Sequence, residues 1–187
     1  MRSVSESLDY IIRTRTEMVR VYGHDDFPVL APPATEESIN RAEAHVGMRF
    51  PPSYRRFLLL SNGIRDFADE IDLLSVEEII RDDYEDVVEE IRDIGWQTGQ
   101  RLAVEGFIIG CQLGNRNIFI IDRTIEPDER GELPVVYWND IELLRAPSFQ
   151  EFLDEWCTVA DQMLADAREK ARVAPPGIPI RVRPPKG

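Results

Sequence analysis

The apolar residues of the first third of the chain follow the period of an α-helix. One apolar stripe runs along residues 3–21 and predicts an amphipathic helix. A second helix is expected over 35–47, where the threonine hydroxyl at its start can cap the first turn. A short third helix should begin at Pro52 and end at Asn62-Gly63, residues that tolerate a left-handed helix exit. The proline-rich stretch between the first two helices predicts an extended linker.

The middle of the chain combines a short strand with a longer helix. The IDLL segment at 71–74 predicts the strand, and the S-V-E-E sequence at 75–78 is a capping box that opens the helix. Helical spacing of apolar residues continues to about Ile94, although Asp82-Asp83 could divide this helix in two. Acidic residues should therefore cover the outward face of a helix.

From Gly106 onward the apolar period changes to that of strands. The segments GFIIG, RNIFIID and LPVVYW are short, β-branched and aromatic, and turn residues separate them, so they predict successive antiparallel strands. A capping box at 148–151 opens a final helix, whose apolar stripe continues to Ala167 and which should lie on the sheet. This order predicts an α+β fold, in which a small, mainly antiparallel sheet packs against N-terminal, middle and C-terminal helices.

Length and composition fit one folded domain with additions at both ends. The 187 residues are 43% hydrophobic, enough for one buried core. We expect an N-terminal helix and linker over 1–34, the main domain over 35–170, and a proline- and arginine-rich tail over 171–187. No stretch has the roughly 20 apolar residues of a membrane span, and no export signal is evident, which indicates a cytoplasmic protein. Cys111 and Cys157 lack paired spacing and are interpreted as core residues.

Charge is unevenly distributed along the chain. The net charge is −13, and residues 66–93 alone carry thirteen acidic groups against two arginines, a net charge of −11. Such a field repels nucleic acid and anionic membranes and attracts a basic protein surface. A solvated face that serves solubility is the alternative explanation.

Candidate catalytic chemistry is sparse. His24 lies in the proline-rich linker and His45 lies late in a helix, and neither accompanies a recognisable nucleophile motif, so both are interpreted as structural. The acidic run lacks the glycine and ligand spacing of an EF-hand, and the glycines at 106, 110 and 114 do not form a phosphate-binding loop. The sequence thus predicts no enzyme, metal site or cofactor. A hydrolase that uses the clustered carboxylates is kept as an alternative.

An ordered motif between residues 35 and 63 resembles the signature of the SUKH (Smi/Knr-like) superfamily. An amphipathic helix with an Ile-x-x-x-Glu element precedes a block of glycine, Phe-Pro, tyrosine, Phe-Leu and Asn-Gly. The matching positions are Ile39, Glu43, Gly47, Phe50, Pro51, Tyr54, Phe57, Leu58, Asn62 and Gly63. The family usually has leucine where this chain has a phenylalanine before the proline, a small change for a core position. Further similarity in LLSVEEI, the paired strands, VVYW and SFQEFLDEW extends the resemblance over residues 35–157.

The resemblance implies a protein-binding module without catalytic residues, in which the signature positions are structural. Bacterial members of the superfamily often resemble immunity proteins encoded beside polymorphic toxins, many of them nucleases. Other members resemble regulators of cell-wall assembly and scaffolds. We therefore expect an immunity protein that neutralises a toxin by binding it, with a regulatory or scaffolding protein that binds a cellular enzyme as the alternative.

The partner-binding site expected from charge is the acidic helix together with the loop before it. We expect this surface to dock on a basic toxin domain, and we expect no nucleic-acid or membrane partner. The sequence leaves the oligomeric state open. The residues predicted to bind the partner are Asp66, Asp69, Glu70, Asp82, Asp83, Glu85, Asp86, Glu89 and Glu90.

Overall fold

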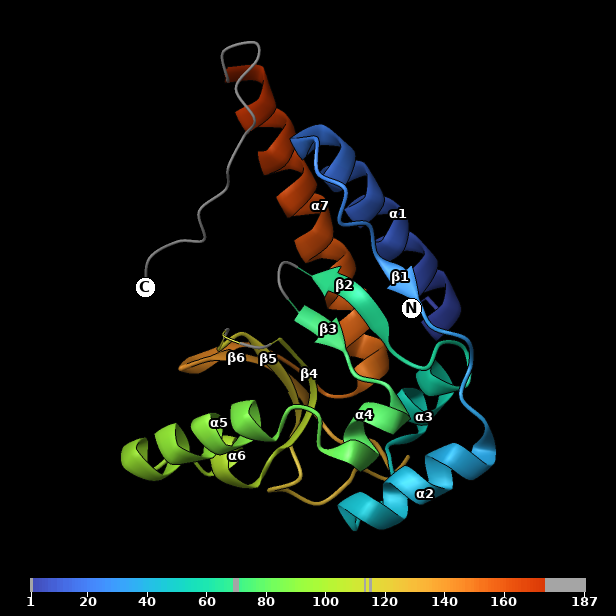
Figure 1. The fold of residues 1–187 in the computed structure, drawn as a ribbon, viewed down its shortest axis with the longest axis vertical. Coiled ribbons are helices and arrows are strands. Elements are labelled where there is room, and N and C mark those ends of the chain that lie inside the picture. Colours follow the sequence, from blue (N-terminus) through green and yellow to red (C-terminus); the bar gives the residue numbers. More distant parts are fainter. Residues whose placement is uncertain (1, 69–70, 113, 115, 174–187) are drawn as a thin grey trace.

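The computed structural model describes residues 2–68, 71–112, 114 and 116–173. Within that part of the chain, strands that follow one another in sequence also lie side by side in one antiparallel sheet of seven strands (Figure 1). The predicted α+β class with an antiparallel sheet is confirmed. The strands are β1 (Val29–Leu30), β2 (Ile64–Ala68), β3 (Ile71–Leu73), β4 (Phe107–Cys111), β5 (Ile118–Ile121), β6 (Val135–Asn139) and β7 (Ile141–Ala146).

Four of the helices begin directly after a serine or threonine whose side chain caps them. The side chains of Ser3, Thr35 and Ser75 each accept a hydrogen bond from the backbone N–H three residues later, and the Ser148 hydroxyl accepts one from Glu151 N–H. The helices are α1 (Val4–Tyr22), α2 (Glu36–Val46), α3 (Pro52–Leu58), α4 (Val76–Arg81), α5 (Glu85–Thr98), α6 (Arg101–Glu105) and α7 (Phe149–Val173). The last helix therefore extends beyond residue 170, where the main domain was expected to end, and residues 174–187 of the predicted tail lie outside the described part.

Four elements were not predicted from the sequence, and each has a weak local signal. β1 has two residues and α6 has five, too few for a measurable period. In β2 two polar residues, Arg65 and Asp66, follow one another between apolar positions. β7 is the last strand of the sheet and is exposed along most of its length, so it lacks a buried apolar face.

The prediction that Asn62-Gly63 form the exit of the third helix is wrong. α3 ends at Leu58, and its capping residue Leu59 is in the right-handed region. The side-chain oxygen of Asn62 instead accepts a 2.9 Å hydrogen bond from the backbone N–H of Val76 and so caps α4. Gly63 has φ +92°, and a Cβ there would lie 2.7 Å from the carbonyl oxygen of Leu73. At Gly63 the chain therefore passes close to the backbone between β3 and α4, where there is no room for a side chain.

An aromatic core lies between the sheet and α7, as the sequence predicted for the last helix. The Tyr54 ring lies 5.3 Å from the Phe149 ring, and the Phe119 ring lies 5.0 Å from that of Trp156. Helix α1 packs along the outer side of α7, and the two helices extend together away from the sheet (Figure 1). Cys111 and Cys157 are both buried and unbridged, as predicted.

Helices α5 and α6 form a hairpin on the other side of β4–β6 (Figure 1). The two helices approach closely at Gly95, where a Cβ would lie 2.8 Å from the Val104 side chain. The indole N–H of Trp138, on β6, donates a 3.0 Å hydrogen bond to the side chain of Gln100. These contacts position α5 on the sheet with one buried and one solvent-facing side.

Several signature positions support the turn between α2 and α3. The carboxylate of Glu43 is nearly buried and accepts a 3.0 Å hydrogen bond from the backbone N–H of Phe50 and a 2.8 Å hydrogen bond from Arg55. Gly47 ends α2, as the sequence predicted, and adopts a left-handed conformation. The side chains of Ile39, Tyr54, Phe57 and Leu58 are fully buried.

Candidate functional site

The acidic segment forms two helices instead of one, because the chain turns sharply at Asp82. This residue adopts φ 52°, a left-handed conformation that ends α4, and α5 begins after Tyr84. The carboxylate of Asp82 lies 3.2 Å from a ring nitrogen of His45, at the end of α2. The division at Asp82-Asp83 that the sequence allowed is confirmed, and it places α4 and α5 on either side of a recess.

Two carboxylates of the acidic segment point inward. Asp72 and Glu78 are nearly buried, and both form ion pairs with Arg65, the Asp72 pair at 2.7 Å. Arg65 also donates a 2.9 Å hydrogen bond to the hydroxyl of Tyr84. Burial alone would raise the pKa of Glu78, but hydrogen bonds from Ser75 and the Arg65 guanidinium hold that pKa below its usual range. These carboxylates hold the sheet and α4 together and do not contribute to an outer docking surface.

Some of the predicted partner-binding residues already have partners within the chain. Asp83 pairs with Arg81 at 2.7 Å, and Glu90 pairs with Arg116 at 3.1 Å. Asp66 is half-buried in β2, where burial together with Asp72 and Asp26 raises its pKa. Asp69 and Glu70, two further predicted residues, lie outside the described part of the chain.

The remaining predicted residues are exposed on α5. Glu85, Asp86 and Glu89 form no ion pair within the described residues. Glu85 and Glu89 lie four residues apart, on the face opposite the buried Val87 and Ile91. The structure therefore reduces the predicted acidic surface to one face of α5, with Asp82 and Asp83 at its N-terminal end.

An exposed tryptophan on the same face was missed by sequence reasoning. Trp96 has 73% of its surface exposed and lies seven residues after Glu89, so both side chains project from the solvent side of α5. The sequence pattern predicted that the helix ends near Ile94, before Trp96, whereas α5 continues to Thr98. A large aromatic side chain in water is typical of binding hot spots. We call Glu85, Asp86, Glu89 and Trp96 the α5 face.

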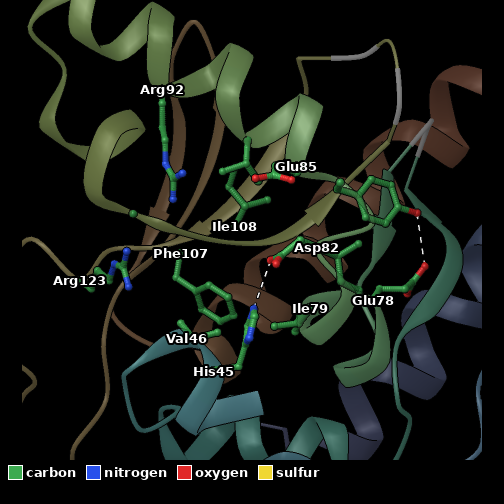
Figure 2. Close-up of a pocket in the computed structure, with 14 residues that line it drawn as sticks. His45, Val46, Glu78, Ile79, Asp82, Glu85, Arg92, Phe107, Ile108 and Arg123 are labelled. Carbon is green, nitrogen blue, oxygen red and sulfur yellow. Dashed lines mark hydrogen bonds and ion pairs between the residues drawn. The ribbon is translucent and has the colours of Figure 1, made fainter. Parts of the chain in front are cut away.

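A cavity of about 280 Å³ lies beside the α5 face, between α2, α4, α5 and the start of β4 (Figure 2). Its apolar lining includes Val46, Ile79, Phe107 and Ile108. The charged and titratable groups around it are His45, Glu78, Asp82, Tyr84, Glu85, Arg92 and Arg123.

The described residues offer little nucleophilic or metal chemistry. Burial raises the pKa of the Cys111 thiol to about 12, and burial also raises that of Cys157, so both thiols stay protonated near neutral pH. No group of three His, Cys, Asp or Glu side chains is arranged to hold a metal ion in the described part. His24 lies against the Tyr22 ring, with 6.0 Å between ring centroids, and does not line the cavity.

Fold and site together define an α+β domain that presents a charged helix face with an aromatic anchor beside a small cleft. The chain belongs to the SMI1 / KNR4 family (SUKH-1), whose model matches residues 33–155. All of α1 and most of α7 lie outside the matched residues, and the two helices pack on one another. A search of curated proteins found no match. In the part of the chain that the structure describes, no helix has the length and apolar character needed to cross a bilayer.

Proposed function

We propose that this protein is a non-enzymatic immunity protein that neutralises a cognate toxin domain by binding it through the α5 face. The observation that carries the proposal is an exposed tryptophan on the same helix face as carboxylates that form no ion pair in the described residues. Membership of the SUKH family supports a protein-binding role. A regulatory or scaffolding protein that binds a cellular enzyme is the alternative that the same family membership supports.

Charge and apolar contact would contribute differently to this binding. The segment 66–93 has a net charge of −11, from thirteen acidic groups and two arginines, and would accelerate encounter with a basic surface. Trp96 would supply most of the affinity by entering an apolar pocket of the toxin, because buried aromatic anchors dominate interface energies. The ion-paired Asp83 and Glu90 would contribute less, since their charge is already partly neutralised.

The carboxylates that line the cavity do not favour a hydrolase. General acid catalysis needs a carboxyl group with a raised pKa, whereas that of Glu78 is lowered. Asp82 is held by His45 on the opposite wall. Only Glu85 among these three is without an ion pair in the described residues, so the cavity has no two unpaired carboxylates that could act as acid and base.

The proposal is tested with the partner isolated by pull-down from the native host and identified by mass spectrometry. We expect a toxin domain whose growth inhibition is relieved by co-expression of this protein. W96A should raise the dissociation constant by about 30-fold or more, the effect of losing a hot-spot residue. V29A is the matched control, because Val29 is 58% exposed on the edge strand β1 and does not line the cavity beside α5. An unchanged affinity of W96A would refute the assignment of the α5 face.

Charge reversal tests the electrostatic part separately. Replacing Glu85, Asp86 and Glu89 by lysine should slow association by about tenfold or more at low salt, and the difference should shrink as salt is added. The control is a triple lysine variant at Glu126, Glu129 and Glu155, which are exposed elsewhere and undergo the same charge change. Equal slowing by both variants would show a general charge effect without a specific face.

A further inference from the structure

The cavity beside the α5 face has a cationic side that the proposed function does not use. Figure 2 shows Arg92, from α5, and Arg123, which follows β5, on one side of the cavity, with Asp82 and Glu78 toward the other. The two arginines come from segments 31 positions apart in sequence, and the packing of α5 beside the β4–β5 pair brings both to the same cavity.

Neither arginine forms an ion pair with a carboxylate within the described residues. This is unusual in a chain of net charge −13, where most exposed arginines near the acidic segment, such as Arg81 and Arg116, are paired. The Nε of Arg123 donates to the backbone carbonyl of Glu105, which fixes that side chain at the cavity rim. The Glu105 carboxylate itself is held by Arg101.

Two acidic groups on the opposite side already have partners within the chain. Glu78 is paired with Arg65, and Asp82 lies 3.2 Å from His45, so neither is available to Arg92. Glu85 is the exception, since it forms no ion pair in the described residues. The cavity therefore presents two guanidinium groups at one side and an apolar floor, and of its three carboxylates only that of Glu85 forms no ion pair in the described residues.

The floor is formed by Phe107 and Ile108 of β4 together with Val46 and Ile79. Phe107 and Ile108 are each 8% exposed, and the Phe107 ring stacks on that of Phe50 at 5.3 Å, which keeps it in place. A volume of about 280 Å³ is at the lower end of ligand pockets and fits one apolar side chain with its attached polar group.

We propose that this cavity binds a carboxylate attached to an apolar group, with the carboxylate between Arg92 and Arg123 and the apolar group on Phe107 and Ile108. Guanidinium groups match the planar geometry of a carboxylate and bind it with charge-assisted hydrogen bonds. The carboxylate belongs either to a free small acid or to the last residue of a peptide, which share this chemistry. The proposal does not depend on a toxin partner.

Binding is tested on the full chain by following backbone amide NMR signals during titration with three probes. These are 3-phenylpropionate, a hexapeptide that ends in phenylalanine with a free carboxylate, and the same peptide with an amidated end. We expect a dissociation constant on the order of 1 mM for the small acid, with shifts at the β4 floor. The peptide acid will bind about tenfold more tightly than the small acid if the natural ligand is a chain end, and more weakly if it is a free acid.

Variants identify the groups responsible. R92M and R123M should each weaken binding of the preferred acid by about tenfold or more, whereas R56M, an exposed arginine on α3 away from the cavity, should leave it unchanged. V46W fills the cavity without changing charge and should abolish binding. Equal binding of the amidated and acid peptides, retained affinity in both R92M and R123M, or no shifts with any probe would each overturn the proposal.

Discussion

The carboxylate of Glu132 accepts a 2.9 Å hydrogen bond from the backbone N–H of Ser53 and a 2.6 Å hydrogen bond from its hydroxyl. Ser53 lies in the first turn of α3, whose capping position is occupied by Pro51 and has no side-chain hydrogen bond of its own. A buried carboxylate from a loop 79 residues away therefore caps this helix and neutralises the positive end of its dipole.

Replacing Glu132 by alanine should destabilise the fold by about 2–3 kcal/mol. The change leaves the N–H and hydroxyl of Ser53 buried without this partner and removes an anion from the start of α3. Urea unfolding followed by circular dichroism measures the effect. E129A in the same loop is the control, because Glu129 is exposed and its removal should change stability by less than about 0.5 kcal/mol. A similar small effect of E132A would contradict the capping role.

Replacing Tyr54 by phenylalanine should raise stability by about 1 kcal/mol. The Tyr54 side chain is fully buried, and its hydroxyl has no hydrogen-bond partner among the described residues. Removing an unsatisfied buried hydroxyl eliminates its desolvation cost, while the ring contacts with Phe57 and Phe149 remain. Urea unfolding of Y54F at neutral pH measures the change.

The matched comparison for Y54F is Y137F, which removes the same atom from a bonded hydroxyl. The Tyr137 hydroxyl donates a 3.0 Å hydrogen bond to the side chain of Asn117, so Y137F should lower stability by about 1 kcal/mol. A loss of stability in both variants would contradict the expected gain from removing an unsatisfied hydroxyl.

The protein should lose stability in acid because two buried carboxylates, Asp122 and Glu78, become protonated. Burial alone would raise the pKa of Asp122, but hydrogen bonds from Thr124 and Arg145 hold it below its usual range, and the pKa of Glu78 is likewise lowered. A lowered folded-state pKa stabilises the fold above the ordinary values, 3.8 for Asp and 4.5 for Glu, and this contribution is lost as the pH falls below them.

The measurement is the urea midpoint between pH 7 and pH 3. It should be nearly constant above about pH 5 and decline below it, and the decline should be shallower in an E78Q/D122N variant. E89Q serves as the control, since Glu89 is exposed on α5 and forms no ion pair in the described residues. If the urea midpoint of the double variant declined with pH as steeply as that of the unchanged protein, these two carboxylates would not be the cause.

Asp66 should have the opposite effect on stability. Burial and the neighbouring carboxylates of Asp72 and Asp26 raise its pKa, so the folded state favours the protonated form and is destabilised by the ionised form at neutral pH. Its φ of 51° also suits asparagine. D66N should therefore raise stability at pH 7 by roughly 0.5 kcal/mol after solvent screening. The gain should disappear as the pH approaches 4, and a loss of stability at pH 7 would contradict this account.

Local sequence signals predicted the parts of the fold that depend on near neighbours. The capping box that starts at Ser75 and the sharp turn at Asp82-Asp83 need contacts within a few residues, and the structure confirms both. Strands β4, β5 and β6 were predicted from short β-branched runs, because each is buried along nearly its whole length. Trp96 was missed because the helix was predicted to end near Ile94, whereas α5 continues to Thr98 and carries Trp96 on its outward face.

Long-range contacts decided the rest. Sequence alone showed an acidic helical segment, but Arg65 of β2 turns Asp72 and Glu78 inward, which no local pattern indicates. Asn62 caps α4 instead of ending α3, because chain crossing at the start of the sheet brings it to Val76. The cavity with Arg92 and Arg123 likewise exists only once α5 packs on the sheet. Helical period and capping act within one or two turns, whereas the choice of partner for each charged group depends on which segments the folded core brings together.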